Sequence, residues 1–375
     1  MHNILIVGAG IVGSALYREL TQHGHNVDII EKQPYLTCEG AAICLPANAM
    51  LELQKLGLDK AVKSHAHQVH AIEYALSDGQ TLAKEKLTEA PLDCAPFVAL
   101  PRFQLVNILR QGIESDIKLG NWLQSLTTNK HQTVVRFNQG QERTYDLVIG
   151  ADGINSQVRE LAFPQSQLRK SHVSNWRFIA SMDTRKIHPT YYVGNDSAFM
   201  IYPISDKQVY CYGQIIDKKE EYYQLPSRQA LQQIFSDYVP QVQICVNSLS
   251  NDDVIVKGEL KSVTQTKAVH QRVVLIGDAL HGCPPSLQQG VGLGLEDVNC
   301  LSALLTQHDI DEALKKFEDK RRKRIAWVVK ESNKIIKLAA MGRSPFGRWV
   351  RNYMIRKKGP ANVSGWKKLL NQAPY

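Results

Sequence analysis

Short apolar runs that end in glycine alternate with segments of helical periodicity near the N-terminus. The run "NILIVG" covers 3–8, apolar residues then recur at helical intervals over 11–23, and a second apolar run covers 26–32. A strand, a glycine-rich turn, a helix and a second strand make a right-handed unit with parallel strands. This part of the chain therefore predicts an α/β domain.

The middle of the chain is rich in strand-forming residues instead. Residues 69–87 alternate around Asp78-Gly79, a pair that favours a hairpin turn. Residues 171–217 are the richest in strand-forming residues and carry Trp, Tyr and Phe, as expected for an antiparallel sheet with an aromatic face. These segments predict a β-rich part that interrupts the α/β part.

Helical periodicity returns over 46–62 and 102–113, and it dominates after Gly290, with breaks expected at Pro345 and Gly347. The predicted fold class is therefore α/β: a Rossmann-like domain with an interleaved antiparallel β-sheet domain and C-terminal helices. We expect the Rossmann-like domain to comprise 1–68, 96–168 and 265–315, the β-rich domain to comprise 69–95 and 169–264, and a basic helical region to comprise 316–375.

Composition places the chain among ordinary soluble globular proteins. Of its 375 residues, 43% are hydrophobic and 22% are charged, and no long uncharged apolar window predicts a membrane-spanning helix. The N-terminal residues lack the features of a signal peptide. The seven cysteines show no metal-ligand spacing. We therefore expect a cytoplasmic protein, monomeric or homodimeric, with no metal site.

The net charge of +9 is concentrated near the C-terminus. Residues 315–358 contain 16 Lys and Arg against 3 Asp and Glu. A solvated helix face is the simplest interpretation, and contact with a membrane surface or an acidic partner is the alternative. No zinc-finger, RNP or helix-turn-helix pattern accompanies the charge, so we expect no nucleic-acid partner.

The first apolar run leads into a dinucleotide fingerprint. Gly8, Gly10 and Gly13 have the G-x-G-x-x-G spacing between a strand and a helix, which permits a tight turn, close approach of a pyrophosphate and close helix–strand packing. The helix N-terminus offers N–H groups to phosphates. Glu31 ends the second strand, where its carboxylate can accept from a ribose 2′-hydroxyl and would repel a 2′-phosphate. The motif predicts FAD or NAD rather than NADP.

Two further strands end in a glycine and an acid. The strand in "DLVIGADGINSQVR" ends at Asp152-Gly153, and the strand in "VVLIGDALHGCPPSLQQGVGLG" ends at Gly277-Asp278. The second turn is followed by a Pro-Pro step and by glycines that open a helix. Each turn alone could be a strand end with a capping acid.

The three turns in this order resemble those of the single-component (class A) flavoprotein aromatic monooxygenases, whose fold is typified by para-hydroxybenzoate hydroxylase. The resemblance spans roughly 3–330, and the layout looks closest to the salicylate, 3-hydroxybenzoate and urate hydroxylases. It implies bound FAD, transient NADH or NADPH, and hydroxylation of an aromatic or polycyclic molecule. In the implied cycle NAD(P)H reduces FAD, O₂ adds at the flavin C4a, and the hydroperoxide transfers oxygen to the substrate.

The resemblance also implies roles for individual residues. The first motif would hold the ADP half of FAD. An arginine would reach the pyrophosphate and ribityl region, and an acid would accept from a ribityl hydroxyl. Backbone groups of Pro285 and Gly290 would lie beside the flavin ring. The cofactor-binding residues implied are Gly8, Gly10, Gly13, Glu31, Lys32, Gly40, Ala41, Arg102, Asp152, Gly153, Gly277, Asp278, Gly290 and Val291.

Two positions depart from the family pattern. The family usually reads P-P-x-x-G-Q-G, and Gln288 replaces the first of those glycines. If that glycine needs a positive φ, Gln288 carries backbone strain. Tyr17 stands where a small residue commonly helps the first helix to pack on the sheet.

The substrate is expected between the flavin and the antiparallel sheet. No catalytic residue stands out; His172 or a tyrosine could deprotonate a phenol, and His281 is expected to make a structural hydrogen bond. Residues of the sheet could equally be core or solvent-facing. The candidate lining comprises Arg177, Tyr202, Tyr210 and Tyr212, together with Trp176, Tyr191, Tyr192 and Met200.

Two other functions remain open from the sequence. A flavoprotein reductase or dehydrogenase without oxygen transfer could use the same scaffold, and so could a noncatalytic nucleotide-binding protein. The segment 344–358 carries aromatic residues at helical spacing among basic ones. Docking on the core or a lid over the substrate opening is expected for it, with membrane contact as the alternative.

Overall fold

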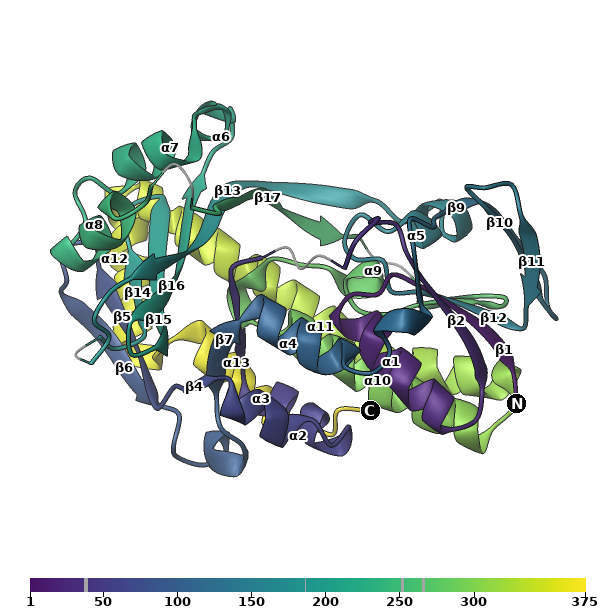
Figure 1. Ribbon diagram of the computed structural model, residues 1–375. Helices are drawn as coiled ribbons and strands as arrows, with labels where there is room; N and C mark the ends of the chain where they lie inside the picture. The colour runs from purple at the N-terminus through teal and green to yellow at the C-terminus, as the bar shows by residue number, and fades with distance from the viewer. Residues whose placement is uncertain (37–39, 186, 251–252, 265–266) are drawn as a thin grey trace.

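The computed structural model describes residues 1–375 except 37–39, 186, 251–252 and 265–266. Two large sheets lie toward opposite ends of an elongated molecule, and the long helix α11 (Ile310–Ala340) runs from one end toward the other (Figure 1).

The first sheet has the strand order of a Rossmann-like domain. Its central strands are buried on both faces, because their residues are almost all Ile, Leu and Val. All its pairs are parallel except β18 with β19. Its strands, in spatial order, are β18 (Val269–His270), β19 (Val273–Leu275), β12 (Leu147–Gly150), β1 (Asn3–Val7), β2 (Asn26–Glu31) and β8 (Ile117–Leu119).

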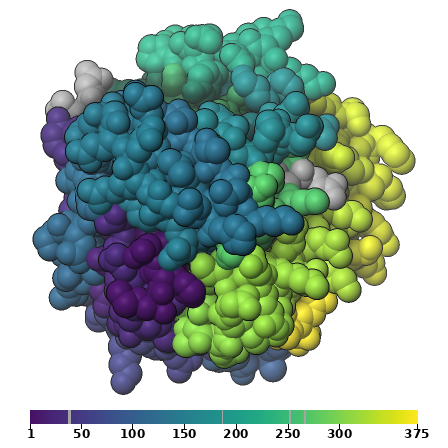
Figure 2. All heavy atoms as spheres, turned by 90° about the vertical axis from the view of Figure 1, so that its right-hand side faces the viewer, coloured from purple at the N-terminus to yellow at the C-terminus, as the bar shows by residue number. Residues whose placement is uncertain are grey.

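Helices from distant parts of the chain cover this sheet. Figure 2 shows the N-terminal segment beside the light-green segment that contains α10, although the two are far apart in the sequence. Tyr17 packs without disturbing α1, because its hydroxyl turns aside to donate to Asp116 Oδ2 at 3.0 Å. The helices of this part are α1 (Ile11–Gln22), α4 (Arg102–Arg110), α5 (Gln157–Ala162), α9 (Asp278–His281) and α10 (Gly290–Gln307).

The second sheet is built mainly from antiparallel strands of the middle segment. The expected hairpin around Asp78-Gly79 joins its edge through β5, which pairs parallel with β14, whereas the other neighbouring strands of this sheet pair antiparallel. Helices α7 (Ser227–Ile234) and α8 (Pro240–Asn247) cover one face. Its strands, in spatial order, are β17 (Val256–Val263), β13 (Leu168–Ser181), β16 (Gln208–Ile216), β15 (Ser197–Ser205), β14 (Thr190–Val193), β5 (Ala71–Leu76) and β6 (Thr81–Lys86).

Smaller elements complete the connection between the large sheets. A three-stranded sheet lies against the face of the second sheet that α7 and α8 leave uncovered, and another extends from the first sheet. The sheet against the second large sheet consists of β3 (Ala42–Leu45), β7 (Val98–Pro101) and β4 (His67–Gln68). The sheet that extends from the first large sheet consists of β9 (Leu123–Thr128), β10 (Thr133–Phe137) and β11 (Glu142–Tyr145). The short helices are α2 (Ala47–Lys55), α3 (Asp59–Ser64) and α6 (Glu221–Gln224).

The C-terminal segment is helical, as expected, and ends in α12 (Pro345–Lys358) and α13 (Ala361–Leu370). Gly347 was expected to break the helix, and this was wrong: it lies inside the first turn of α12, where a Cβ would come within 2.2 Å of the Met341 carbonyl oxygen. Its small size therefore serves packing. Within the described residues, no helix combines the length and apolarity needed to cross a membrane.

The α/β class with an interleaved β-sheet and C-terminal helices is confirmed. The exact domain boundaries stay a prediction.

The approach of α1 to β1 depends on one glycine. A Cβ on Gly13 would lie 1.9 Å from the carbonyl oxygen of Gly8, whereas a Cβ on Gly10 would meet nothing within 4 Å. We expect Gly13→Ala to lower the free energy of unfolding by about 3 kcal/mol or more, because the backbone atom it meets cannot move aside. Urea-induced unfolding followed by circular dichroism measures the change.

Gly10→Ala is the matched control for this substitution. Its effect on the free energy of unfolding should stay within about 0.5 kcal/mol. Equal stability of the Gly13→Ala and wild-type proteins would contradict the packing argument.

Candidate functional site

The glycine turn between β1 and α1 is shaped by its neighbours. Gly8 has φ +101°, and a Cβ there would lie 2.6 Å from the carbonyl oxygen of Ala151. Gly10, in contrast, faces open space. Glu31 ends β2 beside this turn, where its carboxylate accepts from the backbone N–H of Ala9 at 3.1 Å. The turn thus combines a bare backbone with a carboxylate at the expected position.

The second turn, at the end of β12, lies directly against the first. The same Cβ on Gly8 would come within 2.8 Å of the Cα of Asp152. Asp152 Oδ2 accepts from the backbone N–H groups of Gln157 and Val158 at 2.7 and 3.1 Å, so the acid caps α5. Its Oδ1 is buried and has no partner among the described residues, and burial raises the pKa of this carboxyl. An unused acceptor therefore remains in the turn.

The third turn, at the end of β19, meets the same place. A Cβ on Gly277 would lie 3.0 Å from the side chain of Val12 in the first helix. Asp278 follows as an exposed residue, and its carboxylate lies close to Gly290 at the start of α10. Its side chain has no hydrogen bond to the described residues. The three turns therefore converge at the carboxyl ends of β1, β12 and β19, which is where α/β sheets bind ligands.

The segment before β3 is the fourth part of the candidate site. Gly40 has φ +118°, and a Cβ there would lie 2.7 Å from Cδ of Arg102 and 3.1 Å from its Nη1. The arginine side chain can therefore lie across the Gly40 backbone only because the glycine has no side chain. Ala41 and Val291 are half-buried, and Lys32 and Pro285 are exposed.

The uncovered face of the second sheet presents a row of aromatic residues. Strand register places Tyr74, Tyr191, Met200, Tyr212 and Arg177 opposite one another across five strands. These residues turn toward β3 rather than toward α7 and α8. The row therefore forms one wall of the space beside the three turns.

A second row lies next to the first on the same face. Tyr202 and Tyr210 are opposite one another on β15 and β16. Burial raises the pKa of both, and also that of Tyr212, far above the ordinary value. These hydroxyls are therefore neutral hydrogen-bonding groups at physiological pH.

Two of the expected lining residues are on the wrong side. Trp176 and Tyr192 point to the opposite face, where they pack among the residues beneath α7 and α8. Adjacent positions on a strand face opposite sides, so a strand cannot present both Trp176 and Arg177, or both Tyr191 and Tyr192, to one site. His172 is exposed at a bulge of β13 and has φ +52°.

Within the described residues, no group of three or more His, Cys, Asp or Glu is arranged to hold a metal ion. The polar groups described above are backbone N–H groups, which donate, carboxylates, which accept, and the guanidinium of Arg102. Such groups suit a phosphate- and ribose-containing ligand rather than a metal.

Comparison with known proteins decides the family. The model of the family described as "FAD binding domain" matches residues 1–332. The chain belongs to the FAD binding domain family. The expected activity class and cofactor are also confirmed, and the protein is an FAD-dependent monooxygenase with NAD(P)H as its reductant.

Named relatives match almost the whole chain. The 2-heptyl-3-hydroxy-4(1H)-quinolone synthase of Pseudomonas aeruginosa is 28% identical over 361 residues, which cover 94% of this chain and 93% of that protein. The aurachin C monooxygenase/isomerase of Stigmatella aurantiaca is 27% identical over 360 residues, with coverage of 94% and 93%. The Klebsiella pneumoniae HpxO complex with FAD and uric acid has a TM-score of 0.88 at 22% identity, covering 98% of this chain and 96% of that one, and it shows the shared fold.

Gln288, at the position where the family pattern has glycine, lies in the left-handed region of backbone conformation. Its φ is +52° and its ψ is +36°, as expected from the departure in the sequence. Its side-chain amide donates to the Tyr191 hydroxyl at 2.8 Å, and that hydroxyl also accepts from Tyr202 at 3.3 Å. Gln288 Oε1 is buried and has no partner among the described residues. The substitution thus joins the cofactor-side turn to the tyrosine face.

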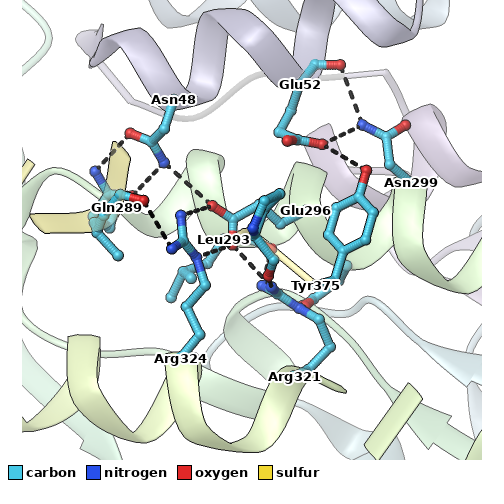
Figure 3. Close-up of polar contacts among 12 residues, drawn as sticks. Asn48, Glu52, Gln289, Leu293, Glu296, Asn299, Arg321, Arg324 and Tyr375 are labelled. Atoms are coloured by element: carbon cyan, nitrogen blue, oxygen red, sulfur yellow. Dashed lines mark hydrogen bonds and ion pairs between the residues drawn. The ribbon is translucent and has the colours of Figure 1, made fainter. Parts of the chain in front are cut away.

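Sequence reasoning missed a buried charge network that anchors α10 of this FAD-binding fold. Figure 3 shows Arg321 and Arg324 of α11 reaching Glu296 of α10. Arg321 contacts Glu296 at 2.9 Å and Asp297 at 2.7 Å, and all three side chains are fully buried. Arg324 adds a two-bond contact to Glu296 at 2.8 Å.

The network reaches both the start of α10 and the C-terminus. Asn48 donates to Gln289 Oε1 at 2.8 Å, just before α10 begins (Figure 3). The carbonyl oxygen of Pro374 accepts from Arg321, and the Tyr375 hydroxyl donates to Glu52 at 3.3 Å. The last residues of the chain therefore help to fix α10.

Asp297 connects the network to the third turn. Its Oδ2 accepts from the Gly277 N–H at 2.9 Å and lies 2.8 Å from Nε2 of His281, so the structural contact expected for His281 is confirmed. Burial opposes ionisation, but Arg321 and His281 outweigh it and hold the pKa of Asp297 below its usual value. Because this folded-state pKa lies below the unfolded value of about 3.9, the stabilisation is present at neutral pH and is lost as the pH falls through the folded pKa.

Arg110 is another residue that the sequence did not single out. It is buried in α4, and its guanidinium Nε and Nη2 both donate to the carbonyl oxygen of Ala9, at 3.0 and 2.6 Å. A buried arginine therefore holds the carbonyl group of Ala9 in the first glycine turn, and Glu31 holds the N–H of the same residue.

Arg321→Met should lower the free energy of unfolding by about 3–5 kcal/mol, because Glu296 and Asp297 would remain buried with less compensating charge. Urea-induced unfolding of the FAD-loaded protein at neutral pH measures this loss. Arg322→Met removes the exposed arginine next to it and should change stability by less than about 0.5 kcal/mol. Similar values for the two variants would refute the importance of the network.

Proposed function

We propose that this monooxygenase hydroxylates a planar, mostly neutral nitrogen heteroaromatic compound that carries an apolar substituent. The observation that carries the proposal is the tyrosine-rich face beside the turns, to which Gln288 adds one unused acceptor. The charged side chain in its aromatic row is Arg177. A relative that matches nearly full length supports the class, since its named product is an alkylated hydroxyquinolone.

The proposed FAD position uses the three turns. Gly8, Gly10 and Gly13 admit the pyrophosphate to the helix N-terminus, and Glu31 accepts from the adenosine ribose. The exposed carboxylate of Asp278 accepts from a ribityl hydroxyl. The further residues proposed to line this cofactor are Lys32, Gly40, Ala41, Arg102, Asp152, Gly153, Gly277, Pro285, Gly290 and Val291.

When bound, FAD supplies hydride acceptance from NAD(P)H and the activation of O₂. The residues of the chain position and shield this chemistry. The N–H groups at the start of α10 favour negative charge at the pyrimidine end of the ring system. Trp366 of α13 donates to the carbonyl oxygen of Leu287 at 2.7 Å, and its ring packs on Phe97 at 5.0 Å, which helps to exclude water.

The proposed substrate lies flat against the tyrosine rows. Stacking between Tyr74 and Tyr191, with ring centroids 4.7 Å apart, holds one edge of this wall rigid. Tyr202, Tyr210 and Tyr212 offer neutral hydroxyls. The guanidinium Nε of Arg177 is buried without a partner in the described part of the chain, so it can donate to a ring oxygen that gains negative charge.

Gln288 gives this site its selectivity in the proposal. Its amide nitrogen is already committed to Tyr191, so the orientation of the side chain is fixed and Oε1 is left as the acceptor. A ring N–H, as in a 4(1H)-quinolone, matches that acceptor. A substrate that lacked the N–H would leave Oε1 unsatisfied and would bind less tightly.

Residues 69–95 and 169–264 are proposed as the substrate domain. The basic region 316–375 is proposed to make peripheral membrane contact, which suits a substrate with an apolar substituent.

Asp278→Asn tests the proposed cofactor position. We expect the dissociation constant for FAD to rise about 10- to 100-fold, because a charge-assisted hydrogen bond is weakened. Fluorescence titration of the FAD-free protein measures it. Asp319→Asn, at an exposed position of α11, should leave the constant unchanged, and equal affinity in both variants would refute the role of Asp278.

The function itself is tested with 2-heptyl-4(1H)-quinolone and its N-methyl analogue. We expect the N–H compound to stimulate NAD(P)H oxidation and to gain one oxygen atom from ¹⁸O₂. The N-methyl analogue should bind the oxidised enzyme about tenfold more weakly. Gln288→Gly, which restores the usual family residue, should bind the two compounds equally.

Failure has two distinguishable forms in this experiment. If neither compound stimulates NAD(P)H oxidation or gains oxygen, the proposed substrate class is wrong. If both are hydroxylated and bind equally to the wild-type enzyme, only the role of Gln288 is wrong.

A further inference from the structure

Helix α12 carries an exposed aromatic stripe at the end of the molecule that holds the second sheet (Figure 1). Phe346, Trp349 and Tyr353 are 75%, 64% and 51% exposed. Their rings stack in sequence, with centroids 6.2 and 5.8 Å apart. Spacings of three and four residues put all three on one side of the helix. Large aromatic side chains seldom gather in water unless the surface contacts a partner.

The opposite side of α12 is firmly attached to the fold. Ile355 packs with Leu82 and Val193 at the edge of the second sheet. Arg351 is buried and donates to the carbonyl oxygen of Gly194 at 2.8 Å. The helix therefore has its core contacts already, and the aromatic stripe faces away from them.

The charge around the stripe is positive. Helix α12 contains five Arg and Lys residues and no acid. Nearby acids are already paired: Asp196 lies 3.8 Å from Arg343, and Glu85 lies 3.3 Å from Lys367. In the part of the chain that the structure describes, the exposed residues Lys357 and Lys358 form no ion pair. The last turn of α12 thus presents uncompensated positive charge beside the aromatic rings.

We propose that α12 docks on the anionic surface of a lipid bilayer. Aromatic rings, Trp and Tyr above all, favour the headgroup level of a membrane, and lysines near them are attracted to anionic lipids. A helix with an apolar stripe and basic ends lies in the plane of such a surface. Pairing of two copies through this stripe would instead bring two sets of uncompensated lysines together, which is unfavourable.

The docked position would also serve the reaction. After Gly359 and Pro360 the chain continues directly into α13, whose Val363 and Trp366 cover the tyrosine face. Tyr74 of that face donates to Asn362 at 3.1 Å. A substrate dissolved in the bilayer would therefore meet the enzyme beside the helix that covers its site. This functional consequence rests on the proposed substrate class, but the docking itself does not.

Flotation of the full-length, FAD-loaded protein with vesicles tests the proposal. One set contains phosphatidylcholine with 30% phosphatidylglycerol, on the order of an anionic cell membrane, and the other contains phosphatidylcholine alone. We expect binding to the anionic vesicles that weakens with added salt. The triple variant Phe346→Ser/Trp349→Ser/Tyr353→Ser should lose roughly tenfold or more in partition coefficient. Lys357→Glu/Lys358→Glu should lose a similar factor on anionic vesicles.

Matched variants elsewhere on the surface serve as controls. Trp122→Ser removes another exposed aromatic residue, and Lys60→Glu/Lys130→Glu makes the same charge change away from α12. Both should float like the wild type, and all variants should keep the FAD absorbance spectrum. Three results would overturn the proposal: no flotation of the wild type, equal flotation of the triple variant, or a stripe-dependent dimer in light scattering without vesicle binding. None of these measurements depends on the substrate.

Discussion

The structure depends on a buried arginine that bridges two adjacent acids. Arg321 of α11 holds Glu296 and Asp297 of α10, and Asp297 in turn accepts from the backbone of Gly277. The position of α10 is therefore fixed by charge as well as by apolar packing. Since charges removed from water are tolerated only when paired, this contact has one geometry in which it is stable. The same contacts therefore fix the position of the turn after β19 and of the start of α10.

Close packing at the glycines also fixes the positions of the turns, in addition to the buried charges. The Gly8 backbone lies so close to Ala151 and Asp152 that any side chain would separate β1 from β12. Arg110 and Glu31 then hold the Ala9 peptide from its carbonyl and its N–H sides. The shape of the first glycine turn is thus set by contacts within the chain. Gly10 faces open space and Asp278 is exposed, so both are accessible to a ligand.

The sequence predicted the elements that local patterns encode. The parallel strands, the three turns and the hairpin at Asp78-Gly79 follow from spacing and turn chemistry, and the positive φ at Gln288 follows from a family comparison. Contacts between side chains that are far apart in the sequence could not be predicted from such local patterns. Arg321 belongs to a basic segment that looks like a solvated helix face, yet it is fully buried, because its partners lie on another helix. The face chosen by Trp176 depended on strand parity, which composition alone does not fix.

Gln288 shows why a departure from a family pattern is informative. A non-glycine residue in the left-handed region costs about 1–2 kcal/mol, and the hydrogen bond to Tyr191 returns about 1 kcal/mol. Its Oε1 is buried without a partner among the residues that the structure describes, which adds a further cost. The residue is therefore unfavourable by itself, and glycine would relieve the strain at this position. In the proposed function, a substrate N–H that donates to Oε1 would offset this cost, which is why we assign the glutamine to recognition rather than to stability.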